Sequence, residues 1–482
     1  MNGWPTRRRA SQREKEIVSP QVWAAATYAT ARLPDARLNA RLVQLASTLA
    51  AKPLDSIPKA SRNWSEAKAI YRFVENGRVT VDDLQEPVAQ CAARRCADYD
   101  VVVVPQDTTG VAFPKANVTE GLGPIVPEPR TTVGMYVHST LAVREDGLAL
   151  GLFDVNCWCR QPPDKQADAK EKRKRPIEEK ESWKWLRGVR AAREAIRSQV
   201  PEGDRPRLIH VMDREGDVYE VLAEIVEARE GAVIRCNQNR RVERMDGQID
   251  SAHQAVRASP VLITRTIDVP RKHGQPKRQA TVEIRACPVR VQPPHDRPKG
   301  CPPLELTLVE VWEPKPPEGV EPLHWRLWTT EPAETVEEVD RVVDIYRLRW
   351  RVEDYHLVLK SGCRVEELQF ETVERLQKMI LIYAPIAVRI LQLRDWARRE
   401  PDAPCTLVLS DLEWRTLCTH MDRKLPPASR APPSLRQAVL WIGRLGGHLN
   451  RKRDGMPGVR TLWQGWRDLL LMTEIYRVTA HH

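Results

Sequence analysis

The sequence predicts an α/β core between two helical regions, and three observations support this fold class. From about residue 79 to residue 395, apolar runs of strand length alternate with amphipathic runs of helical length. Leucines recur at helical spacing over residues 35–51, before this region, and amphipathic runs return after residue 401. With 482 residues the chain is also too long for a single hydrophobic core, so we expect about three domains.

The first region, residues 1–78, is expected to be a small helical domain with helices at about 35–51 and 65–74. Arg37 and Arg41 lie four residues apart on the first of these helices, so their side chains emerge on the same face. Such a pair suits contact with a phosphate backbone. An ordinary basic surface is an equally good explanation on the sequence alone.

The central region, residues 79–395, shows the element order of a ribonuclease-H-like fold. Strands are expected near 101–107, 131–143, 148–155, 208–213 and 232–235, with helices at 181–198 and 217–229 on either side of the fourth strand. Strand-like segments broken by prolines then fill about 237–325, and they predict a β-rich insertion in this core. The last region, residues 396–482, is expected to be helical, with runs at 434–449 and 459–476.

One expected helix carries four polar residues at spacings of three, four and seven, namely Tyr346, Arg349, Glu353 and Lys360. These spacings place all four on one face of an α-helix. Thr335, with a glutamate three residues later, marks the start of this helix as a capping box. A carboxylate between two cations and a phenol suits a site for metal ions and phosphate. A solvated face with ion pairs is the alternative for an isolated charged helix.

Two aspartates elsewhere favour the metal site. Asp107 ends an apolar run that begins at residue 100, and Asp213 ends a second one that begins at residue 208. If these runs are neighbouring strands, both carboxylates emerge at the carboxyl edge of the sheet, where Glu353 could join them. Three crowded carboxylates repel one another unless divalent cations neutralise them, so the trio predicts Mg²⁺ or Mn²⁺. Two ions held in this way suit phosphodiester cleavage.

The composition favours a polyanionic partner and no membrane. Lysine and arginine outnumber the acids 76 to 65, which gives a net charge of +11 and an expected pI of 9.2. Charge of this size is weak evidence by itself. The ten cysteines show no paired zinc-ligand spacing, and neither an apolar stretch of about 18 residues nor an export signal is recognisable. We therefore expect a cytoplasmic protein, in the compartment that holds bacterial DNA if the family resemblance described next is correct.

These residues resemble a known family, the DDE transposases of bacterial insertion sequences. The resemblance is closest to the hairpin-forming insertion-sequence-four group, which includes the enzyme of the kanamycin-resistance transposon. Asp107-Thr108-Thr109 resembles the first-aspartate motif of the family and residues 213–217 the second, while the stripe of four polar residues resembles its tyrosine, arginine, glutamate and lysine signature. The likeness runs through most of the chain, to residues 444–447 and 462–466, and it fails at Leu357, where a lysine is expected.

The resemblance implies a chemistry and a set of partners. Asp107, Asp213 and Glu353 would form the catalytic triad and hold two Mg²⁺ ions, for which Mn²⁺ can substitute. The steps would be nicking, hairpin formation, hairpin opening and joining to target DNA. The substrates would be the inverted-repeat ends of the element and a double-stranded target, and the last region would pair two subunits in a homodimer.

Individual side chains acquire roles in this interpretation. Arg349 and Lys360 would clamp phosphates, and Tyr346 would donate a hydrogen bond to one. By resemblance, Trp325 would stack on a base flipped out of the duplex, whereas Trp350 is assigned to packing.

A further segment, residues 235–241, combines Arg235, Arg240 and Arg241 with amide side chains, a mixture that suits contacts with phosphates and base edges. Two charged loops, 164–181 and 269–277, could follow DNA or simply be solvated. Two other classes remain open: a ribonuclease-H-fold DNA endonuclease, and a catalytically silent DNA-binding derivative.

Overall fold

The structure is a computed structural model, and it describes residues 20–114, 120–125, 132–160, 175–269, 278–294, 301–451 and 454–479. Both charged loops fall largely outside these ranges, because 161–174 and 270–277 are not described. The start of the chain, where no export signal was recognised, is also outside them.

The first region is helical, as predicted. Its elements are α1 (Pro20–Thr27), α2 (Ala36–Ala51), α3 (Ile57–Ala60) and α4 (Trp64–Glu75). Asp35 caps α2 by accepting the Arg37 backbone N–H, and Asn63 caps α4 in the same way. The leucines at helical spacing, Leu42, Leu45 and Leu49, face the core.

A helix that the sequence analysis did not predict follows this region. It is α5 (Val81–Cys96), and it begins with a capping box between Thr80 and Asp83. Its buried face includes Leu84, Val88 and Cys91. The capping box and this apolar spacing were the available sequence signals, and Pro87 inside the helix interrupts the pattern.

The core is a mixed sheet whose element order is the predicted one. Its strands are β1 (Val101–Ala112), β2 (Gly123–Pro124), β3 (Val133–Val143), β4 (Ala149–Trp158), β5 (Arg207–Met212) and β6 (Gly231–Arg235). Strands β1, β5 and β6 run parallel to one another. Strand β3 is antiparallel to β1, and β4 is antiparallel to β3. Helices α7 (Trp183–Gln199) and α8 (Tyr219–Glu227) connect the later strands. One prediction was wrong: Asp107 does not end its strand, because β3 pairs with β1 as far as Ala112.

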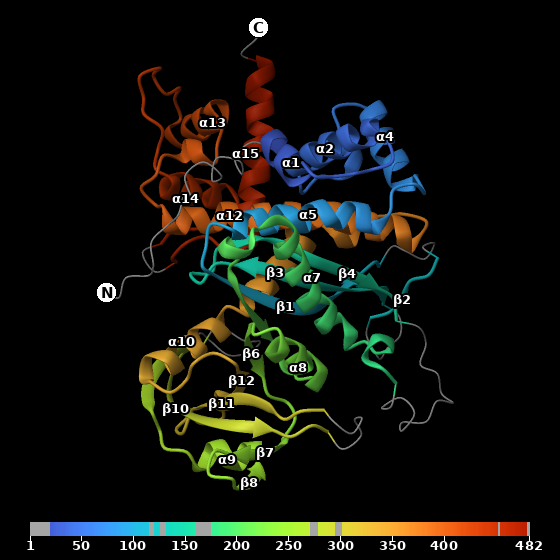
Figure 1. Ribbon diagram of the computed structural model, residues 1–482. Coiled ribbons are helices and arrows are strands. Elements are labelled where there is room, and N and C mark those ends of the chain that lie inside the picture. The colour runs from blue at the N-terminus through green and yellow to red at the C-terminus, as the bar shows by residue number, and fades with distance from the viewer. Residues whose placement is uncertain are drawn as a thin grey trace.

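The strands of the predicted insertion continue this same sheet. They are β7 (Arg241–Arg244), β8 (Ile249–Ser251), β9 (Ile263–Val269), β10 (Arg278–Val291), β11 (Leu304–Trp312) and β12 (His324–Thr329), with α9 (Ala252–Ala258) between β8 and β9. Strand β12 pairs with β6, and β11, β10 and β7 follow in order. Figure 1 shows this part extending below the core. The segment 237–325 therefore lengthens the core sheet instead of forming a sheet of its own.

The expected single helix with the polar stripe is divided into three pieces. They are α10 (Val336–Arg347), α11 (Trp350–Leu357) and a π-helical turn (Val358–Gly362). The predicted capping box of Thr335 and Glu338 is confirmed. The division after α10 arises because Leu348 and Arg349 donate their backbone N–H groups to residues three positions earlier, which tightens the chain into a turn.

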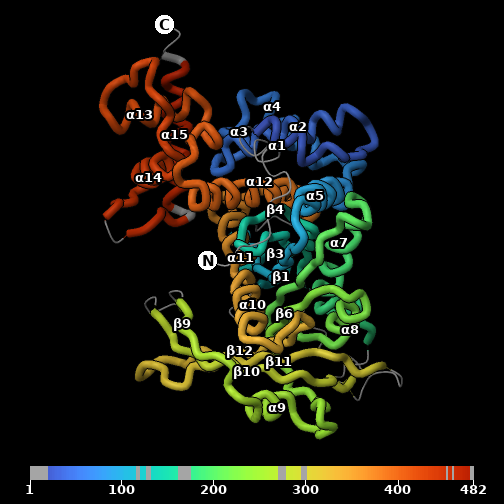
Figure 2. Tube along the Cα trace, turned by 60° about the vertical axis from the view of Figure 1, so that its left-hand side comes forward, coloured from blue at the N-terminus to red at the C-terminus, as the bar shows by residue number. Residues whose placement is uncertain are grey.

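The next helix, α12 (Val373–Arg399), is the central helix of the molecule. In the described part of the chain it is the one helix long and apolar enough to cross a membrane, and 94% of its most apolar window is buried inside the protein. This burial is typical of a core helix. Figures 1 and 2 show α12 beside α5, with the first helical region and the last one on the same side of this pair.

The last region contains α13 (Asp411–Asp422), α14 (Leu435–Leu445) and α15 (Val459–Thr479); α14 and α15 agree with the predicted helical runs, whereas α13 was not predicted. Helices α14 and α15 cross at two glycines. A Cβ atom at Gly465 would lie 1.7 Å from the Ile442 carbonyl oxygen, and one at Gly446 would lie 1.9 Å from the Thr461 carbonyl oxygen. Only glycine permits this approach of the two backbones. The segments 444–447 and 462–466, which contain Gly446 and Gly465, therefore form the close crossing of α14 and α15.

Candidate active site

The carboxyl edge of the parallel strands brings Asp107 and Asp213 together. In the register of β1 and β5, Val103 lies opposite Ile209 and Pro105 lies opposite Val211. Asp107 and Asp213 each follow the second pair by two residues, so they occupy neighbouring positions on adjacent strands. The predicted proximity of these two aspartates therefore follows from the strand register.

Arg349 links the first aspartate to Glu353. Its Nη1 atom lies 3.6 Å from Asp107 Oδ2, and its Nη2 atom forms an ion pair with Glu353 Oε1. The Arg349 side chain is only 12% exposed, whereas that of Glu353 is 48% exposed. The guanidinium thus lies between two carboxylates that come from distant parts of the chain.

Asp107 has a perturbed pKa. Burial raises its pKa to about 6, against the lowering effects of Arg349 and of the Thr108 backbone N–H, and the charges of Asp213 and Glu353 raise it further. The charges of Asp213 and Glu353 therefore act on the Asp107 carboxyl group from nearby. A buried carboxylate with this raised pKa is typical of a functional site.

A buried polar cluster lies behind Asp107, and the sequence analysis missed it. His138 of β3 contacts Thr108 Oγ1 through Nδ1 at 2.9 Å and Gln106 Oε1 through Nε2 at 3.1 Å. Burial lowers the pKa of His138 well below its usual value, so the ring is neutral. Thr108 in turn donates its backbone N–H to Asp107 Oδ1 at 2.8 Å. The sequence signal was the polar run 138–140 inside an otherwise apolar strand.

Tyr346 and Trp325 lie in an aromatic cluster beside these carboxylates. The Trp325 ring lies 5.2 Å from Tyr346, edge to face, and 5.7 Å from Trp350. Trp325 is 4% exposed, so a flipped base could stack on it only if a neighbouring ring moved. Burial raises the pKa of Tyr346, which keeps the phenol protonated.

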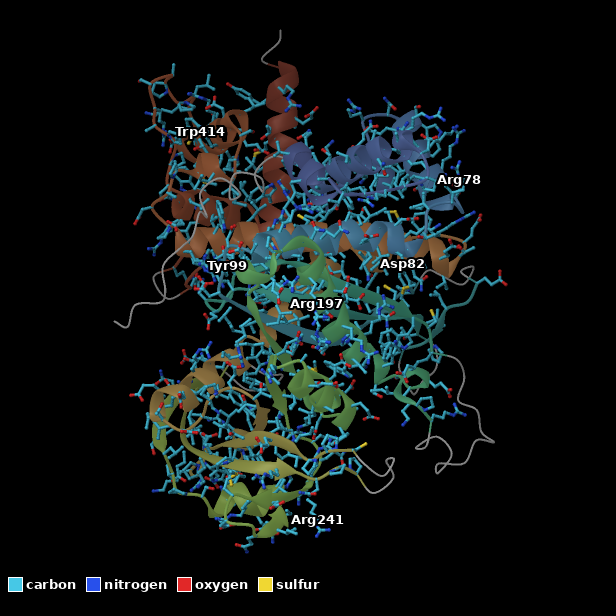
Figure 3. All side chains as sticks on the ribbon, in the orientation of Figure 1. Arg78, Asp82, Tyr99, Arg197, Arg241 and Trp414 are labelled. Carbon is cyan, nitrogen blue, oxygen red and sulfur yellow. The ribbon has the colours of Figure 1, made fainter. Side chains whose placement is uncertain are left out.

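The predicted arginines of segment 235–241 have separate environments. Arg235 is half-buried near Tyr346, donates to the His324 carbonyl oxygen at 3.1 Å, and has its pKa lowered by burial. Arg240 pairs with buried Asp217 at 2.7 Å, so its charge is already neutralised inside the protein. Arg241 is exposed in β7, near the far end of the sheet, as Figure 3 shows.

Asp217 fixes the backbone of segment 235–241, which the sequence analysis expected to contact DNA. Its Oδ2 atom accepts the backbone N–H groups of Asn237 and Gln238, each at 2.7 Å. These bonds and the ion pair with Arg240 hold the segment against the core. The prediction that Arg240 binds phosphate is therefore in conflict with its geometry, while the side chains of Asn237 and Gln238 are exposed.

The remaining predicted contact residues have surroundings of their own. Arg37 is highly exposed and pairs with Asp35 at 2.9 Å, and Arg41 donates to Gln44 Oε1 at 3.3 Å. Lys360 lies in the π-helical turn after α11 and lines an open groove with residues of α15. The structure therefore links Asp107 and Glu353 through Arg349, with Asp213 beside Asp107 and Arg235 near Tyr346, while Arg37, Arg41 and Arg240 contact other residues.

Three family models match the chain. Residues 20–79 match the family described as Transposase DNA-binding, residues 160–388 match Transposase DDE domain, and residues 385–481 match Transposase Tn5 dimerisation domain. The DDE match includes Asp213 and Glu353 and begins after Asp107. These domains define the class of protein: the chain is a DNA-binding transposase of the DDE type. Together the matches support membership of the group that contains Tn5 and insertion sequence four.

A transposase DDE domain implies a ribonuclease-H-like core and divalent metal ions. The chemistry of the trio fits such ions, because all three side chains offer carboxylate oxygens, and burial, together with the charges of Asp213 and Glu353, raises the pKa of Asp107. In the described ranges, however, no three His, Cys, Asp or Glu side chains are near enough to share an ion. Asp107, Asp213 and Glu353 therefore do not converge on one point as expected. Arg349 lies between two of them, Asp107 and Glu353.

Proposed function

We propose that this transposase cuts and joins DNA by metal-dependent phosphoryl transfer at Asp107, Asp213 and Glu353. The observation that carries the proposal is that Arg349 links Asp107 to Glu353, with Asp213 next to Asp107 in the register of the parallel strands. Its ligands would be Mg²⁺ ions, two per site, with Mn²⁺ as a substitute. When bound, such ions activate the attacking oxygen and stabilise the leaving oxygen.

The surrounding side chains would position the DNA. Arg349 is held by carboxylates that a metal ion also binds, so metal binding would free its guanidinium to pair with a phosphate. Tyr346 has a raised pKa and would donate its hydroxyl proton to a phosphate oxygen. Lys360 and Arg235 would supply further positive charge beside this site.

The proposed reaction sequence is nicking at each end of the element, hairpin formation, hairpin opening and joining to target DNA. Residues 1–78 would bind the inverted-repeat ends, 79–395 with the insertion at 237–325 would carry out the chemistry, and 396–482 would form the homodimer. The 395/396 boundary falls inside α12, so the last two parts share one helix and would move together. The protein would act in the cytoplasm, beside the DNA.

The test uses the purified full chain, Mg²⁺, and linear DNA that carries the gene with its flanking sequences. We expect nicked, hairpinned and excised products on a denaturing gel, and their loss in Asp107→Asn and Asp213→Asn. Glu337→Gln is the control, because Glu337 is an exposed acid in the first turn of α10.

Other outcomes would favour the alternatives. Cutting that ignores the flanking sequences would indicate a general DNA endonuclease. Binding of the ends without any cutting, with Mg²⁺ or with Mn²⁺, would indicate a silent derivative. Excision without a hairpin would contradict the proposed reaction sequence alone.

A further inference from the structure

We propose that α15, a helix within the dimerisation match, also contacts the DNA backbone, and that Arg467 is the contacting residue. The inference rests on the proposed role of Lys360 in holding a phosphate. It adds a second function to the last region of the chain, which the family matches assign to dimerisation.

The first observation is a shared groove. An open groove of about 550 Å³ separates the π-helical turn from α15. Its lining residues are Leu54, Lys360, Ser361, Arg364, Glu367, Trp463, Gln464 and Arg467. Three of these residues are cations and one is an acid, so the formal charge of the lining is +2. A groove with this charge suits a polyanion.

The second observation is that one of these three cations, Arg364, already has several partners within the protein. Arg364 donates from Nε to Glu367 Oε1 at 2.6 Å, makes a further ion pair with the same carboxylate, and reaches the Leu54 carbonyl oxygen at 3.3 Å. This ion pair is exposed, but the additional bond to the Leu54 carbonyl oxygen anchors Arg364 to the first helical region. The charge that remains belongs to Lys360 and Arg467.

Among the described residues, Arg467 forms an ion pair with one acid, Asp468, and this pair is exposed to solvent. It contacts Asp468 at 3.2 Å, and the two side chains are 49% and 38% exposed. Such surface pairs contribute little to stability, so the guanidinium can exchange this partner for a phosphate at small cost. Arg467 can also engage a phosphate with two parallel N–H groups, which a lysine cannot.

The third observation is that the packing of α15 orients this face towards Lys360. Trp463 is buried against the π-helical turn, where a Cβ atom at Gly362 would lie 3.8 Å from its ring. Arg467 lies four residues after Trp463, on the same side of α15. Gln464 lies three residues before Arg467 and neighbours it on the helix surface. The glycine crossing of α14 and α15 holds this arrangement, and a π-helical turn is itself frequent at functional sites.

The ligand class follows from continuity with the proposed active site. Lys360 lines the groove, and it follows α11, the helix that carries Glu353, by three residues. Successive phosphates of one DNA strand follow each other along the duplex, so a backbone held at Lys360 presents neighbouring phosphates to the opposite wall. The proposed occupant is therefore the phosphodiester backbone of duplex DNA.

The experiment measures binding of the full chain to two fluorescent duplexes of equal length, in EDTA and over a range of salt concentrations. One duplex carries the sequence that flanks the gene, and the other carries an unrelated sequence. For Arg467→Gln we expect about 3–10-fold weaker binding of either duplex at low salt, with the slope of log affinity against log salt smaller by about 1. Arg467→Lys should keep most of the slope.

Arg477→Gln is the matched control. Arg477 lies on the same helix about 15 Å further along, in an exposed pair with Glu474, and it does not line the groove. We expect unchanged affinity and unchanged slope for this variant. Sedimentation of each variant checks that the oligomeric state and the folded fraction equal those of the wild type.

Two results separate this inference from the proposed function. If wild-type protein cuts DNA but Arg467→Gln binds both duplexes with unaltered affinity and slope, the inference is overturned while the proposed function stands. If no variant or wild type cuts DNA but Arg467→Gln weakens binding as stated, the α15 contact stands and the proposed catalysis fails.

Discussion

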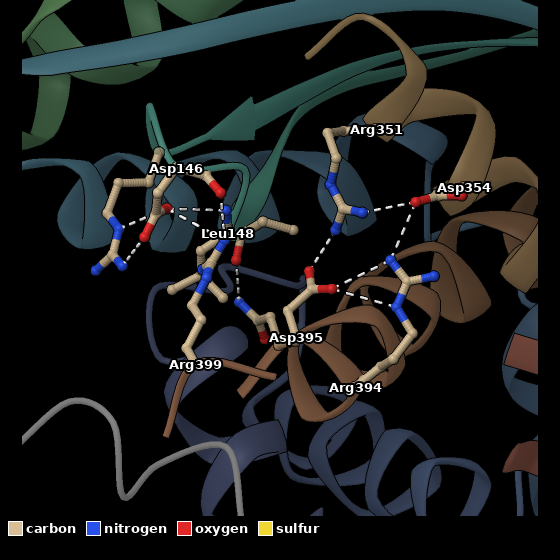
Figure 4. A network of polar contacts seen from close by, with 10 residues as sticks. Asp146, Leu148, Arg351, Asp354, Arg394, Asp395 and Arg399 are labelled. Carbon is tan, nitrogen blue, oxygen red and sulfur yellow. Dashed lines mark hydrogen bonds and ion pairs between the residues drawn. The ribbon is translucent and has the colours of Figure 1, made fainter. Parts of the chain in front are cut away.

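Helix α11 carries two clusters of charged residues on different sides, and the contrast between them is instructive. On one side, Arg349 and Glu353 face Asp107 at the sheet edge. On the other side, Arg351 and Asp354 face α12, where Figure 4 shows them in a closed ring of contacts with Arg394 and Asp395. Both clusters contain arginine and acid at helical spacing, yet their charge balance differs.

The α12-facing ring is balanced. Two arginines meet two aspartates, and Asp395 is almost fully buried between Arg351 and Arg394. At the sheet edge, by contrast, Arg349 contacts two carboxylates while Asp213 adds a third negative charge. A balanced ring holds α11 in place, whereas an unbalanced cluster is able to recruit a cation.

The largest expected effect is the loss of DNA cleavage, and it should distinguish two neighbouring residues on opposite sides of α11, Glu353 and Asp354. Glu353→Gln should lower DNA cleavage on the order of 10³-fold without loss of stability, because it removes a proposed metal ligand. Asp354→Asn should lower the free energy of unfolding and leave cleavage per folded molecule nearly unchanged. Cleavage assays and urea denaturation measure both quantities. Equal loss of cleavage in the two variants would contradict this division of roles.

The next largest effect is a loss of stability on disrupting the ring that faces α12. Asp395→Asn should lower the free energy of unfolding by about 3–5 kcal/mol, because it leaves the guanidinium groups of Arg351 and Arg394 with Asp354 as their one remaining carboxylate in the ring. Glu474→Gln is the control: its pair with Arg477 is exposed, and we expect a change below about 1 kcal/mol. Urea denaturation at constant pH gives both values. A loss below about 1 kcal/mol for Asp395→Asn would show that the ring does not hold α11.

A pH-dependent effect tests the unbalanced cluster. Because the pKa of Asp107 is raised to about 6 in the folded protein, the folded state binds an extra proton between pH 4 and pH 6, and ionisation above this range destabilises it. Without added metal, Asp107→Asn should therefore raise the free energy of unfolding by roughly 1–3 kcal/mol at pH 8, and by nothing below pH 4. Denaturation curves at the two pH values measure this difference. A gain that is independent of pH would have another cause.

The smallest effect is stabilisation by metal. At Mg²⁺ tenfold above its dissociation constant, wild-type protein should gain about 1.4 kcal/mol, because the ion binds only the folded state. Asp107→Asn and Glu353→Gln should gain much less. Thermal unfolding with Mg²⁺ and after chelation provides the measurement. Equal stabilisation of all three proteins would place the ion elsewhere.

Local pattern was enough for many of the elements. The capping box at Thr335, the apolar strands at β1 and β5, and the helices α2 and α15 were all visible in the sequence. These features depend on neighbours within a few residues, because hydrogen bonding at helix ends and hydrophobic periodicity are local properties. The break after Leu348 was not visible, since it consists of a change in backbone hydrogen bonding without a proline or glycine.

The sequence by itself determined which residues can do the chemistry, and the tertiary structure decided how each charged residue is used. Arg240 has the same charge as Arg349, but Asp217 neutralises it from 23 positions away, while Arg349 bridges two acids at the sheet edge. Trp325 is buried by rings that come from α10 and α11. The energy of a charge or a ring depends on its partners and its exposure to water, and folding brings those partners together from distant positions in the chain.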